Sequence, residues 1–129
     1  MSVTRFPIPD SRFPTMAAPD LDLLRGTLDL LILKTLDLAP LHGYGIGQRI
    51  EQMSGGVFRI TLGALYPALQ RLERTGMVKA EWDVSDNNRR ARYYKITAAG
   101  RRRLAKGQKA WELNVAAMMR VLRAQGESR

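Results

Sequence analysis

The groups in this sequence that are best placed for chemistry are cations gathered in one segment. The 129-residue chain carries 21 Lys and Arg against 12 Asp and Glu, a formal net charge of +9. Nine cations, equal to the whole excess, lie in an acid-free stretch: Arg89, Arg90, Arg92, Lys95, Arg101, Arg102, Arg103, Lys106 and Lys109. Guanidinium and ammonium groups at this density indicate a polyanionic partner. A charged face that contacts only water has the same composition, so charge alone leaves both interpretations open.

Groups for catalysis or metal binding are sparse by contrast. The sequence has no cysteine, which excludes disulfides, iron–sulfur clusters and thiolate zinc sites. His42 is its one histidine and stands at an expected helix start, where a cap or a phosphate contact fits better than acid–base catalysis. Asp83 and Asp86 precede a turn and have no catalytic partner. We therefore predict a protein that is not an enzyme and that uses no metal or cofactor.

Three helices are expected ahead of the basic segment. Leucines cover more than one face of residues 21–38, so this helix must be buried on more than one side. A second helix is expected over about 42–53. A third, with leucines on one face, begins at an N-cap on Thr61 and stops at Gly76.

After Gly76 the apolar period changes to two. Residues 77–84 and 90–97 are predicted to be strands, joined by turn-forming residues at 85–88. The result is a β-hairpin with a polar, basic tip.

The last helix is expected from an N-cap at Thr97 to about Ala124. It carries one long apolar stripe: Leu104, Trp111, Val115, Met118 and Leu122. The rest of the chain leaves nothing for this stripe to cover, so we predict a dimerisation helix. A helix that folds back on its own domain is the alternative.

Three helices followed by a basic hairpin describe a winged helix-turn-helix, a mainly α fold with a small β-hairpin. We divide the chain into a flexible, proline-rich arm (1–20), the winged helix-turn-helix domain (21–97), the dimerisation helix (98–124) and a tail (125–129). Met16 is a second candidate for the natural start. In this architecture the third helix enters the major groove of double-stranded DNA, and the hairpin lies along the phosphates or in the minor groove.

The third helix carries groups suited to DNA opposite its leucines. Gln70 can read adenine edges, and Tyr66 can bond a phosphate or contact a thymine methyl group. Gly63 allows backbones to approach closely. An ordinary solvated helix face is the alternative, and part of Tyr66 can belong to the core.

The hairpin tip carries four further candidates: Asn88, Arg89, Arg90 and Arg92. Arginines here can neutralise phosphates or enter a narrow minor groove; a soluble hairpin with exposed cations is the alternative. Strand alternation places Tyr94 on the face of the arginines, so we expect Tyr94 to accompany them and Tyr93 to pack inward.

Several segments together resemble the PadR family of bacterial transcriptional regulators: GTLDLLILKTL, HGYGI, LGALYPALQRLERTGMVKAEW, NNRRARYYKITAAGRRRL and the later Trp111. The resemblance spans about Leu23 to Leu122, and a single C-terminal helix is similar to the short-tailed group of that family. It implies a homodimer, built from the first and last helices, that binds an inverted-repeat operator and often represses adjacent genes.

The resemblance also implies roles for individual residues. It assigns base recognition to Thr61, Gly63, Tyr66 and Gln70, and wing contacts to the arginines of the hairpin. His42 and Tyr44, in the segment HGYGI, are further candidates for contacts with the DNA backbone.

Trp111 has two interpretations. In relatives that sense planar aromatic compounds, a tryptophan at the matching place lines a pocket between subunits. The resemblance therefore implies a small aromatic effector bound near Leu30, Trp111 and Val115. Other leucines of the first helix would crowd such a pocket, so a packed dimer core is the alternative.

Two rival classes remain beside a sequence-specific repressor. A sequence-tolerant nucleoid protein has the same charge and differs in specificity. A membrane-surface protein could use Arg101, Arg102 and Arg103, but no aromatic-anchored amphipathic face accompanies them. No apolar run approaches the roughly 20 residues of a membrane span, and no export signal is evident at the N-terminus. We expect a cytoplasmic protein without a membrane partner.

Overall fold

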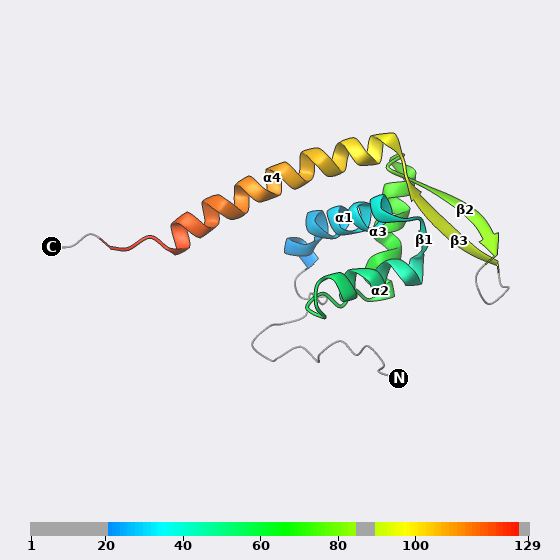
Figure 1. The fold of residues 1–129 in the computed structure, drawn as a ribbon, viewed down its shortest axis with the longest axis horizontal. Helices are drawn as coiled ribbons and strands as arrows, with labels where there is room; N and C mark the ends of the chain where they lie inside the picture. Colours follow the sequence, from blue (N-terminus) through cyan, green and yellow to red (C-terminus); the bar gives the residue numbers. More distant parts are fainter. Residues whose placement is uncertain (1–20, 85–89, 127–129) are drawn as a thin grey trace.

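The computed structural model describes residues 21–84 and 90–126, which form four helices and one three-stranded antiparallel sheet. The helices are α1 (Leu21–Leu38), α2 (Gly43–Met53), α3 (Leu62–Arg74) and α4 (Ala98–Leu122), and the strands are β1 (Leu41–His42), β2 (Val78–Val84) and β3 (Arg90–Ile96). The first three helices cluster together, the β2–β3 hairpin extends to one side and α4 to the other (Figure 1). The predicted fold class, mainly α with a small hairpin, is confirmed.

Some predicted features lie outside the described residues. These are the arm at 1–20, the end of the tail at 127–129, and the hairpin tip with Asn88 and Arg89.

The hydrophobic core lies between the helix cluster and the base of the hairpin. Its fully buried apolar side chains come from the first three helices: Ile32, Leu33, Ile46, Leu65, Leu69 and Leu72. Helix α1 contacts α2, α3, α4 and β3. The prediction that the first helix is buried on more than one face is therefore confirmed, and its physical reason is its central position.

Polar caps define where α3 and α4 begin. The Ala64 amide donates to Oγ1 of Thr61 at 3.2 Å, and the Gly100 amide donates to Oγ1 of Thr97 at 3.0 Å. Each cap satisfies an amide that the helix leaves unpaired, a contribution of about 1 kcal/mol. Gly76, with φ of +78°, follows the end of α3, where an L side chain would be strained.

The sheet differs from the expectation in two respects. Residues Leu41 and His42 form β1, which pairs with Tyr94 and Tyr93 of β3, so α2 begins at Gly43 rather than at His42. The prediction that Tyr93 packs inward is wrong, because Tyr94 is the buried tyrosine, 4% exposed, while Tyr93 is half-buried.

The reason is that one face of the hairpin changes surroundings along its length. Tyr94 does share the face of Arg92, as alternation requires. At the base of the hairpin, however, that face covers the helix cluster, where Val78, Tyr94 and Ile96 are buried. Only its outer half, which carries the arginines, extends past the helices (Figure 1).

Helix α4 behaves differently in its two halves. Leu104 is buried, and a Cβ at Gly107 would lie only 2.5 Å from Cδ2 of Leu30, so the first half crosses close to α1. The second half carries exposed apolar side chains: Leu113, Met118, Val121 and Leu122. The fold-back alternative thus describes only the first half of the helix.

Candidate nucleic-acid interface

The outward face of α3 is open to solvent. Thr61, Gly63, Tyr66 and Gln70 are all exposed, whereas Leu65, Ala68, Leu69 and Leu72 on the opposite face are buried. The leucine spacing predicted this buried face, except that Leu62, the first leucine of the predicted stripe, is exposed because it lies at the start of the helix. The hydroxyl oxygen of Thr61 already caps the helix, but its proton remains able to donate to an external acceptor.

Gly63 is a glycine that this fold does not need. A Cβ added there would meet only Oγ1 of Thr61, at 3.9 Å, and the residue lies in ordinary helix. Gly43 contrasts with it, because a Cβ there would lie 2.8 Å from the ring of Tyr66. Tyr66 therefore rests against the start of α2 and is partly covered, while the surface at Gly63 is left bare.

His42 and Tyr44 lie at the start of α2. Nδ1 of His42 accepts a hydrogen bond from the Gly45 amide at 3.1 Å, so the histidine is the N-cap, and its ring meets Tyr93 edge-on at 5.7 Å between centroids. Nε2 is then the nitrogen that can donate to an external group. Tyr44 is exposed and lines a shallow polar hollow with Gln48 of the same helix.

On the outer half of the hairpin, arginines and an aromatic ring share one face. Arg92 pairs with Trp82 across the strands, and Arg90 pairs with Val84. The guanidinium carbon of Arg90 lies 4.8 Å from the centre of the Trp82 ring, and that of Arg92 lies 5.9 Å from it. Sequence reasoning missed Trp82, although the same alternation that grouped the arginines places it opposite them.

Arg92 also joins the hairpin to α3. Its Nη2 lies 2.8 Å from Oε2 of Glu73, and its guanidinium carbon lies 5.9 Å from the ring centre of Tyr94. Burial raises the pKa of Tyr94, Arg92 lowers it, and Glu73 and Tyr66 raise it further. The wing and α3 are thus held together by a charged group that the sequence analysis assigned to DNA alone.

Ion pairs in the folded protein neutralise part of the positive charge of the basic segment. Acids from elsewhere in the chain pair with four of its cations: Arg92 with Glu73, Lys95 with Glu81, Arg101 with Asp37, and Arg103 with Asp29. Within the described part of the chain, Arg90, Arg102, Lys106 and Lys109 take part in no ion pair. Counting charge along the sequence could not reveal this, because the partners are distant in sequence.

One buried carboxylate connects three helices. The side chain of Asp29 on α1 is 8% exposed; its Oδ1 lies 3.1 Å from Nη2 of Arg71 on α3, and its Oδ2 lies 3.1 Å from Nη2 of Arg103 on α4. Two cations compensate the cost of burying this charge. Asp29 therefore ties the outward-facing helix α3 to α4 through α1.

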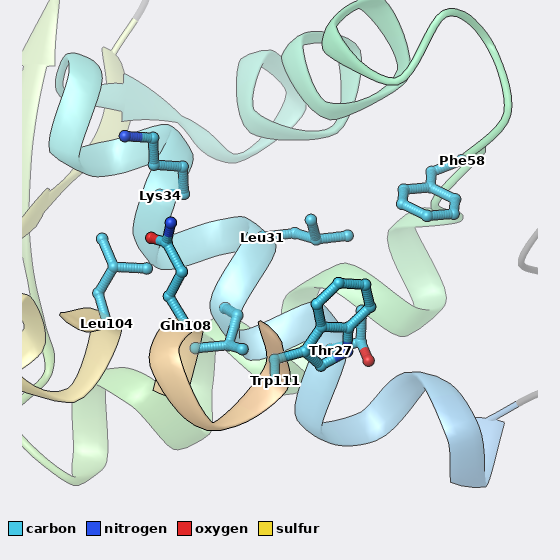
Figure 2. Close-up of a pocket in the computed structure, with 8 residues that line it drawn as sticks. Thr27, Leu31, Lys34, Phe58, Leu104, Gln108 and Trp111 are labelled. Atoms are coloured by element: carbon cyan, nitrogen blue, oxygen red, sulfur yellow. The ribbon is translucent and has the colours of Figure 1, made fainter. Parts of the chain in front are cut away.

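A cavity of about 240 Å³ lies between α1 and α4. Its lining residues are Thr27, Leu30, Leu31, Lys34, Phe58, Leu104, Gln108 and Trp111. In Figure 2, Thr27, Leu31 and Lys34 extend from α1, and Leu104, Gln108 and Trp111 extend from α4. Two of the three predicted pocket residues, Leu30 and Trp111, line it. Val115 does not, because it lies one turn further along α4.

Residues 21–84 and 90–126 contain neither a metal-binding cluster nor a membrane-spanning helix. These residues contain no group of three His, Asp or Glu side chains arranged to hold a metal ion. None of their helices combines the length and apolarity that a membrane crossing requires.

Comparison with known proteins identifies the family. Residues 32–106 match the family described as "Transcriptional regulator PadR-like family". An uncharacterized protein from Lysinibacillus sphaericus is 37% identical over 91 residues, 70% of this chain and 83% of that protein. A transcriptional regulator from Clostridium thermocellum is 29% identical with a TM-score of 0.70, over 77% of this chain and 96% of that one. A PadR-family transcriptional regulator from Eggerthella lenta DSM 2243 is 30% identical with a TM-score of 0.70, over 81% and 89%. The chain therefore belongs to the PadR-like family of transcriptional regulators and is not an enzyme.

Proposed function

We propose that this regulator binds double-stranded DNA sequence-specifically, as a homodimer on an inverted-repeat operator, and represses transcription there. The proposal rests on the difference between the two faces of α3, one of which is buried and the other exposed. One side is buried leucine, while the other presents an open row that includes a glycine with no packing role. A helix with such an exposed face, next to a cationic hairpin, can enter the major groove of DNA.

Each candidate residue has a role in this proposal. Gln70 and Tyr66 contact base edges or methyl groups, and Gly63 lets the helix approach the bases, with Thr61 beside it. His42 and Tyr44 contact phosphates. The wing contributes Arg90 and Arg92 and, from the sequence alone, Asn88 and Arg89.

The homodimer rests on the second half of α4. Met118, Val121 and Leu122 form an exposed apolar surface on a part of the helix that lies beyond the core. Surfaces of this kind mark protein interfaces. A second copy of the chain presents the same helix, and a two-fold axis through the pair would give two α3 helices for two operator half-sites.

The test is competition binding measured by fluorescence anisotropy. We expect the duplex upstream of the protein's own gene to bind roughly a thousandfold more tightly than random duplex. Equal affinities would contradict the repressor and favour a sequence-tolerant nucleoid protein.

Two glycine variants test whether α3 contacts the DNA. Gly63→Ala fits the fold but adds a methyl group to the proposed interface, so we expect a loss of about tenfold or more in operator affinity. Gly26→Ala is the matched control, because Gly26 is also helical and exposed, and a Cβ there meets nothing within 4 Å. Both changes favour helix by up to about 1 kcal/mol, so only DNA binding distinguishes them. Equal operator affinities would remove α3 from the interface.

We also propose that the α1–α4 cavity binds a small aromatic effector that relieves repression. Its volume is below the roughly 300–1,000 Å³ of drug-sized sites, which favours a compound of one or two rings. Lys34 and Gln108 offer polar contacts to a mainly apolar lining.

The dye dansylamide, whose aromatic part is two fused rings, serves as a probe of the cavity. We expect its emission to rise on binding, Trp111→Ala to abolish that rise, and the bound dye to release the operator. Dye binding that Trp111→Ala leaves unchanged would contradict the proposal and favour a packed dimer core.

A further inference from the structure

Packing among residues 21–84 and 90–126 does not explain the exposed tryptophan of the wing. Trp82 is 59% exposed, although tryptophan is a residue that gains most from burial. It lies in the middle of β2, opposite Arg92. Val84, the next residue on the same face, is similarly exposed.

Two cations lie beside the Trp82 ring. Both Arg90 and Arg92 place their guanidinium carbons within 6 Å of the ring centre, the range in which a cation is attracted to an aromatic face. Arg92 is also held by Glu73. The indole ring therefore limits the freedom of two long side chains that would otherwise lose much conformational entropy on binding a partner.

Charge distinguishes the two faces of the outer hairpin. Glu81 and Asp83 alternate with Trp82 along β2, so they lie on the opposite face. Among the described residues, Glu73 of α3 reaches the Trp82 face, and Arg92 neutralises it. The Trp82 face is therefore aromatic and positive, and it suits an anionic partner. A second copy of the same face would bring arginines against arginines.

We propose that Trp82 is a DNA-contacting and positioning residue of the wing. Its ring orients Arg90 and Arg92 toward the phosphates, and its exposed edge packs on the deoxyribose of the same strand. The inference rests on the proposed DNA binding and adds a residue that combines apolar and electrostatic contact. The outer half of the hairpin extends beyond the helix cluster (Figure 1), which leaves this face accessible to a duplex.

The first experiment uses tryptophan fluorescence. The sequence has two tryptophans, so Trp111→Phe leaves Trp82 as the single reporter in the full-length chain. We expect the duplex upstream of the gene to change the emission of Trp82 and to lower its quenching by acrylamide at least twofold. Binding that is evident in anisotropy but leaves Trp82 emission and quenching unchanged would overturn the inference alone. Absence of binding to any duplex at low salt would overturn the proposed function and this role with it.

The second experiment separates contact from positioning. We expect Trp82→Ala to weaken duplex binding about tenfold and Trp82→Phe, which keeps a ring, to restore most of it. Val84→Ala is the matched control, an equally exposed apolar side chain of the same face, and we expect a change of less than about threefold. An equal loss for Trp82→Ala and Val84→Ala would show that the ring has no special role.

A double-mutant cycle then tests the stacking itself. Arg90→Ala alone is expected to weaken binding and to lower the salt slope by about one. In the Trp82→Ala background the same change is expected to weaken binding several-fold less, because the guanidinium is no longer oriented. Additive losses would overturn the positioning role.

Discussion

The outer half of the wing and the outer half of α4 both extend beyond the core, and each is associated with a half-exposed tryptophan. Trp82 on the wing is 59% exposed and Trp111 on α4 is 48% exposed. Two guanidinium groups flank Trp82, whereas Trp111 shares a cavity with Leu30, Phe58 and other mainly apolar groups. An exposed tryptophan alone does not identify a partner. The groups around the tryptophan identify the partner, because cations attract a polyanion and apolar groups favour an apolar surface.

The largest expected effect tests the apolar side of this comparison. Met118→Glu places a charge on the exposed apolar surface of α4, and we expect a monomer in sedimentation velocity. Losing one of two linked half-site contacts lowers operator affinity by about 100-fold or more. Ala116→Glu adds the same charge on the opposite face of the helix and is expected to remain dimeric. Dimers of both variants would place the interface elsewhere.

Truncating each tryptophan contrasts the two regions directly. In chemical denaturation, we expect Trp111→Ala to lower the free energy of unfolding by about 2 kcal/mol. This is less than the roughly 3–5 kcal/mol of a fully buried aromatic residue, because half of the ring is exposed. Trp82→Ala is expected to change it by less than about 0.5 kcal/mol, as for other surface residues. Similar losses of unfolding free energy in both variants would contradict the view that Trp111 is packed and Trp82 is not.

Asp29 joins α3, which the wing contacts through Arg92, to the packed first half of α4: its carboxylate lies beside Arg71 of α3 and Arg103 of α4. Asp29→Asn leaves two cations without their partner, and we expect a loss of about 1–2 kcal/mol in urea unfolding. The value is below that of a fully buried pair because both arginines are partly exposed. Asp37→Asn breaks the more exposed pair with Arg101 and is the control, with an expected loss of less than about 1 kcal/mol. Equal losses would mean that burial of Asp29 adds nothing.

The smallest effect is expected at high pH. Burial raises the pKa of Tyr94 above the usual value of 10.0, so above pH 10 the unfolded chain loses a proton that the folded chain keeps. The free energy of unfolding should therefore be insensitive to this group below pH 10 and fall as the pH rises above it. Tyr94→Phe is expected to reduce that fall, whereas Tyr44→Phe, at an exposed site, is expected to leave it unchanged. A fall of the same steepness in Tyr94→Phe would contradict a raised pKa.

Local signals predicted most of the fold. Thr61 and Thr97 were recognised as N-caps because a hydroxyl acts on an amide three residues away, a distance that the sequence encodes directly. The change from a leucine stripe to alternation after Gly76 predicted where α3 ends and the hairpin begins. The open face of α3 followed from the same periodicity, so its candidate residues could be named before the structure.

The features that were missed depend on residues far apart in sequence. The two-residue strand β1 has no periodicity of its own and exists only because β3 lies beside it. Glu73 and Asp29 neutralise cations from a different part of the chain, so a count of local charge overstated the positive field.

By itself, the sequence determined the order of elements, their caps, the two faces of α3 and the membership of a regulator family. Only the tertiary structure decided that Tyr94 rather than Tyr93 is buried, that Trp82 lies among arginines, and that α4 leaves the core halfway along its length. Helix and strand periods specify which side chains share a face. What that face meets depends on how far each element extends past its neighbours, and this is a property of the packed molecule.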